Sequence, residues 1–248
     1  MSNDIFKVKK SGLLTTIQDR GRVGYQQYGI VVAGAMDTFS MNISNFLVGN
    51  KGDEAVLEVT VMGPKLEVLG DAVIAICGGN LSPMVNGEKV SMWKSFEVNA
   101  GDKLEFGQPV EGARAYISVA GGFDIPVVMG SKSTYLKAGL GGFEGRALEK
   151  GDVLKGAGKV DGKSGRALHY DEIPSYEKEM EIRVVMGPHL HAFTDEAVET
   201  FLSSTYEVTP KSDRMGFRVT GPQLRACNVC GHYLRGNSAR RYSSTSKR

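Results

Sequence analysis

The stretch Gly12-Leu-Leu-Thr-Thr-Ile-Gln-Asp-Arg-Gly-Arg-Val-Gly-Tyr-Gln26 joins an apolar, β-prone segment directly to a turn of charged residues and glycines. Similar short β-prone segments recur along the chain every ~8–12 residues, a spacing typical of β-sandwiches and β-barrels. The expected strands are 6–9, 13–17, 56–61, 66–69, 72–77, 95–98, 103–106, 114–120 and 153–154. The sequence therefore predicts a mainly β protein with roughly eight to ten strands.

Two of these β segments carry more specific signals. Residues Ala72–Cys77 are apolar on both faces, so we expect a central strand. Residues Met84–Val90 surround an Asn-Gly pair, which favours a two-residue hairpin turn. Glycine is abundant, with 32 residues in the chain, and has no triplet repeat. This composition is consistent with many tight turns between short strands.

Helices are expected at only two places. Asp37 can cap a helix that runs to about Val48, followed by the stop signal Gly49-Asn50. Thr194 can cap a second helix from Asp195 to about Ser203. The apolar residues expected to form the buried face of the first helix are Met36, Phe39, Ile43, Phe46 and Leu47.

Length and charge exclude several classes of protein. The 248 residues are 41% hydrophobic and 23% charged, which is ordinary for a folded globular chain. The net charge is +2, but six of the 30 basic residues lie after position 224, where no acidic residue occurs, so the preceding part is mildly acidic. A nucleic-acid-binding domain is therefore not expected. No membrane span or secretion signal is expected either, and we predict a cytoplasmic protein.

The turn that follows the first quoted strand is a candidate anion site. Gln18, Asp19, Arg20 and Arg22 are held between glycines, and arginine offers paired donors that match a carboxylate or a phosphate. The alternative is that Asp19 pairs with an arginine and only fastens the turn. We expect substrate or anion binding by Gln18, Arg20 and Arg22.

Two further segments could contribute to the same site. Small residues at 33–35 allow a close backbone approach before Asp37, although Asp37 needs no function beyond capping its helix. The loop Gly130-Ser-Lys-Ser-Thr-Tyr135 superficially resembles a phosphate loop, but the Walker order is absent. Lys132 and the neighbouring hydroxyls could still contact an anion, and an ordinary flexible loop is the alternative.

Metal and cysteine chemistry are not expected. His189 and His191 form an H-x-H pattern on an expected strand, without a third ligand in view. Cys77 lies in an apolar strand and is expected to be an inert core thiol. Cys227 and Cys230 form a single C-x-x-C, which lacks both the second pair of a zinc ribbon and a thioredoxin-like setting. The low cysteine content fits a reducing compartment.

Taken together, the motifs resemble the allophanate-hydrolase-subunit-2-like family, also described as biotin-dependent carboxyltransferase subdomains A and B. The matching runs occur in the family's order and cover residues 5 to about 224. They are Gly12–Gln26, Gly34–Asp37 with Leu47–Asn50, Leu57–Pro64, Ala120–Pro126, Gly130–Arg146 and Ser212–Gly216. The resemblance is strongest to the members that serve 5-oxoprolinases.

The resemblance implies a fold and an activity. It implies two cyclophilin-like β-barrel subdomains, and work in a complex with two partners, the KipI-like B subunit and the A subunit of a 5-oxoprolinase. Such a complex opens 5-oxoproline to L-glutamate with ATP and, we expect, Mg²⁺, which a partner could bind. Alternatives are a regulatory protein that antagonises a KipI-like kinase inhibitor, and a carboxyltransferase module of a biotin-dependent urea or amide system. No biotin-accepting Met-Lys pair is present, so no covalent biotin is expected on this chain.

Residue type and position suggest the roles within this site. Opening an unactivated amide needs cations for the developing charge and a carboxylate that orients water. We expect orienting or base roles for Asp19, Asp37 and Asp213, and anion binding by Arg20, Arg22 and Arg214, with Lys132 and Lys211 as additional cations. Asp213 and Arg214 are included because Ser212–Gly216 loosely repeats the pattern of Gln18–Arg22.

The resemblance stops at about Leu224, where the pattern changes to a basic, cysteine-containing sequence. The change looks like translation in a shifted frame followed by an early stop, which would leave the second barrel incomplete and open-edged. We therefore expect a first β-barrel subdomain with its linker at residues 1–175, the start of a second at 176–224, and a disordered tail at 225–248. The shortened chain is expected to be active only with its partner subunits, if at all.

Overall fold

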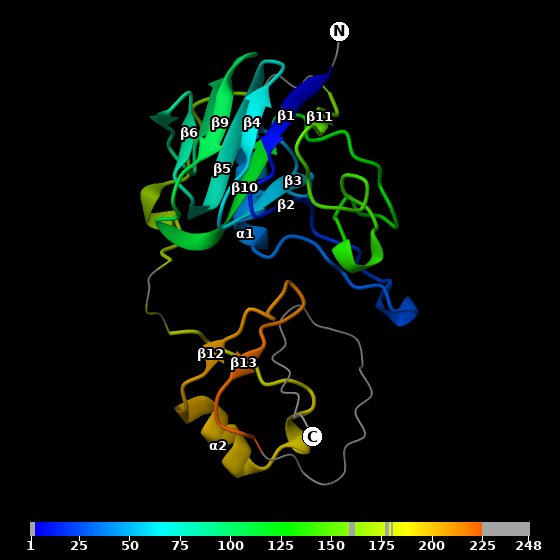
Figure 1. Ribbon diagram of the computed structural model, residues 1–248, viewed down its shortest axis with the longest axis vertical. Helices are drawn as coiled ribbons and strands as arrows, with labels where there is room; N and C mark the ends of the chain where they lie inside the picture. The colour runs from blue at the N-terminus through cyan, green and yellow to red at the C-terminus, as the bar shows by residue number, and fades with distance from the viewer. Residues whose placement is uncertain (1–2, 159–161, 177–178, 180, 225–248) are drawn as a thin grey trace. The chain divides into compact units, whose positions relative to one another are not determined.

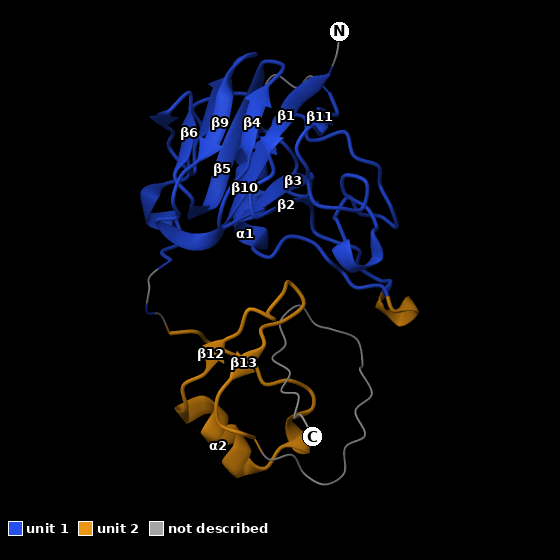
Figure 2. Ribbon diagram, in the orientation of Figure 1, with its two compact units in different colours: residues 1–25, 30–180 blue, residues 26–29, 181–248 orange. Residues whose placement is uncertain are grey.

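A computed structural model describes residues 3–158, 162–176, 179 and 181–224 of the chain. The chain divides into two compact units, shown in different colours in Figure 2. Unit 1 comprises residues 1–25 and 30–180, and unit 2 comprises residues 26–29 and 181–248. The predicted tail at 225–248, with Cys227 and Cys230, lies outside the described residues.

Unit 1 contains two antiparallel sheets (Figure 1). The six-stranded sheet has the order β11-β1-β4-β9-β6-β7. Its strands are β1 (Asp4–Lys10), β4 (Lys65–Val68), β6 (Pro83–Val85), β7 (Glu88–Lys89), β9 (Lys103–Phe106) and β11 (Val153–Lys155). The first strand of the chain thus lies between β4 and the last strand of the unit, with Phe6 opposite both Val68 and Leu154.

The second sheet has five strands in the order β2-β3-β10-β5-β8. These strands are β2 (Leu14–Gln18), β3 (Val56–Thr60), β5 (Ala72–Asn80), β8 (Ser95–Val98) and β10 (Glu111–Val119). The expected central strand is confirmed, because β5 pairs with both β10 and β8, and residues 74–79 are buried. The prediction of a mainly β protein is confirmed as well.

The main core of unit 1 is a cluster of apolar side chains contributed by both sheets. Period-two alternation directs one face of each strand into it. The six-stranded sheet supplies Phe6, Val8 and Leu66, among others. The members from the five-stranded sheet are Ile17, Leu57, Val59, Ile74, Ile76, Val98, Ala115, Ile117 and Val119. This packing holds the end of β2, where the predicted site begins, against a rigid scaffold.

The hairpin between β6 and β7 has the predicted turn. Asn86 and Gly87 have φ angles of +53° and +86°. Positive φ at both central residues defines a type I′ turn, which matches the twist of the two strands that it joins. The Asn-Gly pair is therefore a reliable local signal in this sequence.

Helix α1 (Thr38–Val48) begins and ends where the sequence predicts. The Asp37 side chain accepts a hydrogen bond from the Ser40 amide, and Gly49 ends the helix in the left-handed conformation. Of the predicted buried face, Leu47 is buried, but Met36, Phe39 and Phe46 are exposed. The residues buried against β5 and β10 are Ser40, Met41, Ser44, Asn45, Leu47 and Val48. Phe39 and Phe46 are instead about half-exposed.

The inward face of α1 is partly polar, because Ser40, Ser44 and Asn45 are buried there beside three apolar residues. Ser44 Oγ lies 2.5 Å from Ser118 Oγ of β10, and it also donates to the carbonyl of Met41. Small hydroxyl side chains permit this close contact and satisfy each other's hydrogen-bonding groups. The spacing of apolar residues in the sequence does not reveal that Ser44 of the helix contacts Ser118 of β10.

Residues 162–176, which lie in the linker predicted at 156–178, pack on the rest of unit 1. Leu168, Ile173 and Tyr176 contact the small apolar cluster that contains Trp93 and Cys77. The backbone is held as well, because the Leu168 amide donates to the Trp93 carbonyl at 3.0 Å. The segment also includes a short 3₁₀ helix, η3 (Tyr170–Glu172), and an earlier one, η2 (Leu136–Ala138), lies in the glycine-rich loops.

Unit 2 contains α2 (Asp195–Ser203) and a two-stranded sheet of β12 (Glu207–Val208) and β13 (Val219–Thr220). The predicted cap of α2 is confirmed, because Thr194 accepts a hydrogen bond from the Ala197 amide. The prediction that the two histidines lie on a strand is wrong: His189 precedes and His191 lies within the 3₁₀ helix η4 (Leu190–Ala192). A further 3₁₀ helix, η1 (Gln26–Tyr28), lies in the other described part of this unit. Among the described residues, no helix has the length and apolar character needed to cross a membrane.

Candidate functional site

The carboxylate of Asp19 is the centre of a dense hydrogen-bond cluster at the end of β2. Its Oδ1 atom accepts from the Gly21 amide at 2.7 Å, from Ser131 Oγ at 2.7 Å and from Ser133 Oγ at 2.6 Å. Its Oδ2 atom accepts from the Lys132 amide at 2.5 Å. The partners are hydroxyls and backbone amides rather than an arginine. Asp19 therefore fastens the turn, as the alternative interpretation expected, but through the loop at 131–133.

The donors of this loop bind an anion of the protein itself, the Asp19 carboxylate. The sequence suggested that Lys132 and the hydroxyls of this loop could contact an external anion. In the structure the Ser131 and Ser133 hydroxyls and the Lys132 amide donate to Asp19, while the Thr134 hydroxyl donates to the Ile17 carbonyl. A charge-assisted hydrogen bond of this kind is about twice as strong as a neutral one. The described loop therefore does not fit the phosphates of a nucleotide, because its donors are already occupied.

Arg22 is also directed inward. Its side chain is completely buried, its Nε donates to the Val128 carbonyl at 3.2 Å, and its Nη2 donates to the Ser133 carbonyl at 2.5 Å. Burial lowers the pKa of Arg22, and the nearby Asp19 carboxylate opposes that shift. Its Nη1 has no hydrogen-bond acceptor among the described residues. In this conformation Arg22 holds the 128–133 loop, and its anion-binding role stays a prediction.

Gln18 is buried beside the same loop. Its Nε2 donates to Thr16 Oγ1 at 3.0 Å and to the Thr134 carbonyl at 3.3 Å. Its Oε1 is buried and has no donor among the described residues. Gln18 is thus buried against neighbouring residues and has no surface that a ligand in solvent could contact.

The backbone joins the Asp19 turn to the segment before α1. The Ala35 amide donates to the Asp19 carbonyl at 2.8 Å, and the Arg22 amide donates to the Val32 carbonyl at 2.7 Å. Gly34 has a φ of +82°, and a Cβ atom there would lie 2.8 Å from the Arg20 carbonyl oxygen. The expected close approach of this small-residue segment is therefore confirmed. Arg20 is exposed at this junction, so its guanidinium can reach a ligand in solvent.

Asp37 lies at the other end of the same segment and is half-buried. Its carboxylate accepts from Ser40 Oγ at 2.5 Å and from the Tyr176 hydroxyl at 3.2 Å. Burial is the main cause that raises the pKa of Tyr176, to about 12, and the Asp37 carboxylate adds to the shift. Asp37 therefore caps α1 and also anchors the segment that follows residue 162.

Sequence reasoning missed a buried pair below Asp37. Glu58 of β3 and Tyr116 of β10 are cross-strand neighbours with almost no exposed surface. The Tyr116 hydroxyl donates to Glu58 Oε2 at 3.0 Å and accepts from the Asp37 amide at 2.8 Å. Glu58 also accepts from the Met36 amide at 2.9 Å and lies 3.4 Å from Arg114 Nε. The available signal was a lone carboxylate within the apolar strand 56–59.

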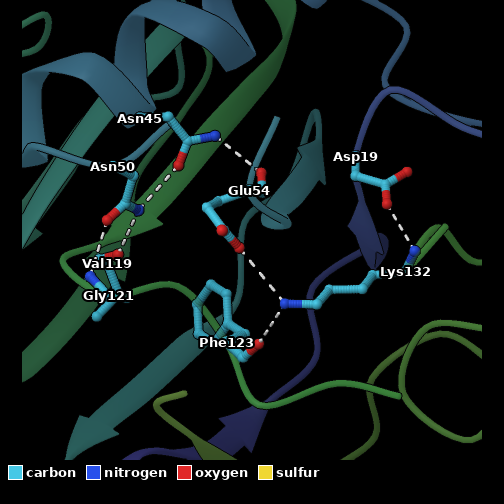
Figure 3. Close-up of polar contacts among 8 residues, drawn as sticks. All are labelled: Asp19, Asn45, Asn50, Glu54, Val119, Gly121, Phe123 and Lys132. Atoms are coloured by element: carbon cyan, nitrogen blue, oxygen red, sulfur yellow. Dashed lines mark hydrogen bonds and ion pairs between the residues drawn. The ribbon is translucent and has the colours of Figure 1, made fainter. Parts of the chain in front are cut away.

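Lys132 connects the Asp19 cluster to the loop after β10 (Figure 3). Its ammonium lies 3.4 Å from Glu54 Oε2 and 3.3 Å from the Phe123 carbonyl, while its amide donates to Asp19. The Lys132 ammonium is thus held by the protein, and its contact with a substrate anion stays a prediction. A Cβ atom on Gly122 would lie 3.1 Å from Glu54 Oε2, so glycine leaves room for this pair.

Three of the predicted site residues belong to unit 2 and lie in or next to one turn. Asp213 accepts a hydrogen bond from the Met215 amide at 2.7 Å within a turn that closes at Gly216. Lys211 is exposed, and Arg214 is half-buried. Because they belong to unit 2, the participation of Lys211, Asp213 and Arg214 in a site with Asp19 stays a prediction.

The described residues were also compared with the requirements of metal binding and of thiol chemistry. Within them, no group of three His, Cys, Asp or Glu side chains is arranged to hold a metal ion. Cys77 is completely buried, and this burial raises the pKa of its thiol far above the usual range. Cys77 is therefore a core thiol with a very low thiolate fraction at neutral pH.

Comparison with known proteins identifies the class. The family described as the carboxyltransferase domain, subdomain A and B, matches residues 28–236, and the chain belongs to this family. The chain is 36% identical over 222 residues to the C subunit of the Escherichia coli 5-oxoprolinase, covering 89% of this chain and 70% of that protein. It is also 36% identical over 231 residues to urea amidolyase of Lachancea kluyveri, covering 88% of this chain but only 13% of that much longer protein.

Solved structures agree with this assignment. The crystal structure of the Kluyveromyces lactis urea amidolyase matches with a TM-score of 0.82 and 34% identity, over 90% of this chain and 14% of that one. A crystal structure of TTHA0988 matches with a TM-score of 0.80 and 29% identity, over 89% of this chain and 80% of that one. The family predicted from the motifs is therefore confirmed.

Proposed function

We propose that this chain is a subunit of an ATP-dependent 5-oxoprolinase, which opens 5-oxoproline to L-glutamate together with the KipI-like B subunit and the A subunit of that enzyme. The observation that carries the proposal is the similarity to the C subunits of two 5-oxoprolinases, 36% identical over 222 residues for the E. coli protein and 32% over 221 residues for the Haemophilus influenzae protein. The chain spans 70% of the E. coli C subunit and about an eighth of the urea amidolyases.

The proposed reaction needs two contributions from this chain. The substrate is a cyclic amide with a free carboxylate, and its ring opens only when charge that develops on the amide is stabilised. Arg20 is the exposed cation at the junction of the Asp19 turn and the Gly34 segment, so it is assigned to the substrate carboxylate. Asp37 has a half-buried carboxylate at the start of α1 and is assigned to the orientation of water.

The ATP-dependent part of the reaction is assigned to a partner subunit. The donors of the 131–133 loop are directed to Asp19, and the ammonium of Lys132 is directed to Glu54 and Phe123. With these groups engaged, the 131–133 loop offers few free donors for a nucleotide. The proposed division of work is substrate binding by this chain and nucleotide binding elsewhere in the complex.

The test is glutamate release from 5-oxoproline and ATP. We expect release only when this chain is mixed with both partner subunits. The Arg20→Ala variant should raise the KM for 5-oxoproline at least tenfold, and Arg20→Lys should recover part of the affinity because it keeps the charge. Lys89→Ala, at the exposed hairpin of β7, is the matched control and should leave KM unchanged.

Two results would reject this proposal in different ways. Absence of glutamate from the complete mixture would reject the 5-oxoprolinase function. Normal kinetics of Arg20→Ala would reject only the assignment of Arg20.

The second candidate is a carboxyltransferase module, which the fold match to the urea amidolyase structure favours. In that case the complex should transfer a carboxyl group from carboxybiotin, carried on another chain, to urea or a related amide. Carboxylation of urea by the mixture, without glutamate release from 5-oxoproline, would favour this candidate.

A further inference from the structure

Tyr176 belongs to the segment 162–176, which follows the last strand of unit 1 and which the sequence predicted as a linker. Its hydroxyl donates to Asp37 Oδ2 at 3.2 Å, across 139 positions of sequence, and lies 3.3 Å from Ser40 Oγ. A side chain of this segment thus reaches the start of α1. The proposed function places the water-orienting carboxylate at the same point.

The Asp37 carboxylate has three hydrogen-bond donors among the described residues. Its Oδ1 atom accepts from the Ser40 amide at 3.0 Å, and its Oδ2 atom accepts from Ser40 Oγ at 2.5 Å and from the Tyr176 hydroxyl. An ionised carboxylate offers about four acceptor positions, two on each oxygen. The protein therefore fills both positions of Oδ2 and one of Oδ1. A water molecule that donates to the remaining position of Oδ1 would be held in one defined direction.

The contribution of Tyr176 differs from that of Ser40. Both Ser40 donors belong to the first turn of α1, so they hold the carboxylate to the helix. The Tyr176 hydroxyl comes from a separate segment and contacts the same carboxylate from there. Donors from two different elements fix the rotation of the carboxylate as well as its position, which is what an oriented water requires.

Tyr176 is itself held in place by the rest of unit 1. Its ring packs against the apolar cluster that contains Trp93. Earlier in the segment, the Ser95 amide of β8 donates to the Arg166 carbonyl at 2.8 Å, and the Gly165 amide donates to the Ser95 carbonyl at 2.9 Å. Because β8 is an edge strand, these bonds attach the segment to the side of the five-stranded sheet. The hydroxyl of Tyr176 is therefore presented by a fixed support.

The chemical state of Tyr176 suits a permanent donor. Burial is the main cause that raises the pKa of Tyr176 to about 12, and the Asp37 carboxylate adds to the shift. The hydroxyl therefore keeps its proton at neutral pH. It can donate to Asp37 throughout a reaction without gaining or losing a proton.

We propose that Tyr176 is a positioning residue of the hydrolase, which holds the Asp37 carboxylate so that Oδ1 orients the attacking water, and that residues 162–176 therefore belong to the active site. The inference rests on the proposed function, which assigns the water to Asp37. In that reaction the water oxygen bonds to the ring carbonyl carbon and the carbon–nitrogen bond breaks. The two water protons go to the leaving nitrogen, so a carboxylate and an ammonium group form. ATP hydrolysis stays with the partner subunit.

The experiment measures glutamate release by the complete mixture, with rates divided by the amount of assembled complex. Tyr176→Phe should lower kcat at least tenfold and leave the KM for 5-oxoproline within twofold, because the ring stays in its cluster and only the hydrogen bond is lost. Tyr170→Phe is the matched control. It removes a hydroxyl from the same segment at a residue that is 74% exposed, and it should change neither constant.

A double-mutant cycle separates positioning from a purely structural role. Asp37→Asn keeps an oxygen that can cap α1 but removes the charge, and it should lower kcat at least a hundredfold. If Tyr176 acts through Asp37, Tyr176→Phe should lower the remaining rate less than twofold in the Asp37→Asn background. A tenfold loss in both backgrounds would show that Tyr176 only stabilises the segment, and it would overturn the proposal.

The outcomes also separate this inference from the proposed function. Normal kcat of Tyr176→Phe in an active mixture would reject the positioning role while the 5-oxoprolinase function stands. A raised KM with unchanged kcat would assign Tyr176 to substrate binding instead, which also overturns the proposal. Absence of glutamate from the wild-type mixture would reject the proposed function, and this inference with it.

Discussion

The hydroxyl of Ser133 donates to the carboxylate of Asp19 at 2.6 Å, across 114 positions of sequence. With Ser131 and two backbone amides, this contact closes the glycine-rich loop over the end of β2. The end of β2 and the distant loop are thereby held together by the Asp19 carboxylate. The stability of this contact should therefore depend on that carboxylate.

Removal of the Asp19 carboxylate should destabilise unit 1. Asp19→Ala leaves several buried donors without an acceptor, so we expect the free energy of unfolding to fall by about 2–4 kcal/mol. The Ser131→Ala/Ser133→Ala variant should also be destabilised. Adding it to Asp19→Ala should cost much less than it does alone, because the shared interaction is already lost. Urea denaturation of the four proteins measures this coupling, and strictly additive losses would contradict the cluster.

Gly34 should tolerate alanine poorly for a steric reason. Its positive φ is strained for any side chain, and its Cβ would also contact the Arg20 carbonyl oxygen. Gly87 has a similar φ of +86° but open space around it. We therefore expect Gly34→Ala to lower the free energy of unfolding by about 2–4 kcal/mol and Gly87→Ala by about 1 kcal/mol. Equal losses in the two variants would show that the close approach of the backbone contributes nothing.

Cys77 should be unreactive in the folded protein. Its burial and raised pKa leave almost no thiolate at pH 8, whereas an unfolded cysteine with a pKa of about 8.5 is substantially ionised there. In a Cys227→Ser/Cys230→Ser background, a thiol reagent should label Cys77 at the rate of global or local unfolding. Adding urea should accelerate labelling steeply. Fast labelling under native conditions would contradict the buried position of Cys77.

Tyr176 should make stability depend on pH in the alkaline range. Its pKa is raised to about 12 in the folded state, against about 10 in an unfolded chain. Between these values the unfolded state has lost the proton that the folded state retains, so the free energy of unfolding falls as pH rises from 10 to 12. Tyr116, whose pKa burial also raises, acts in the same direction. The Tyr176→Phe variant should therefore show a shallower decline than the wild-type protein, and identical slopes would contradict this contribution.

Local signals predicted much of the fold. The Asn86-Gly87 turn, the Asp37 and Thr194 caps and the strand at Ala72–Cys77 depend on neighbouring residues, and all four are confirmed. The buried face of α1 was predicted only in part, since Leu47 is buried but Phe39 and Phe46 are not. The apolar spacing alone does not reveal that Ser44 contacts Ser118 of β10.

The site was predictable only in part, because its contacts span long sequence separations. Asp19 and the 131–133 loop were each singled out, but nothing local shows that one is the ligand of the other. Arg22 illustrates the same difficulty, since a buried arginine that binds carbonyls and a surface arginine that binds anions have the same sequence signature. Glu58 and Tyr116 become visible only when β3 pairs with β10.

The position of β1 in its sheet has a consequence for biosynthesis. One side of β1 pairs with β4, but its other side pairs with β11, the last strand of unit 1 to leave the ribosome. About 85 residues separate the end of β4 from the start of β11. At ~5–20 residues per second, the nascent chain therefore presents an unpaired strand edge for about 4–17 s. During that interval the open edge of β1 can pair with a strand of another chain, so a newly made protein is most prone to aggregate before β11 is synthesised.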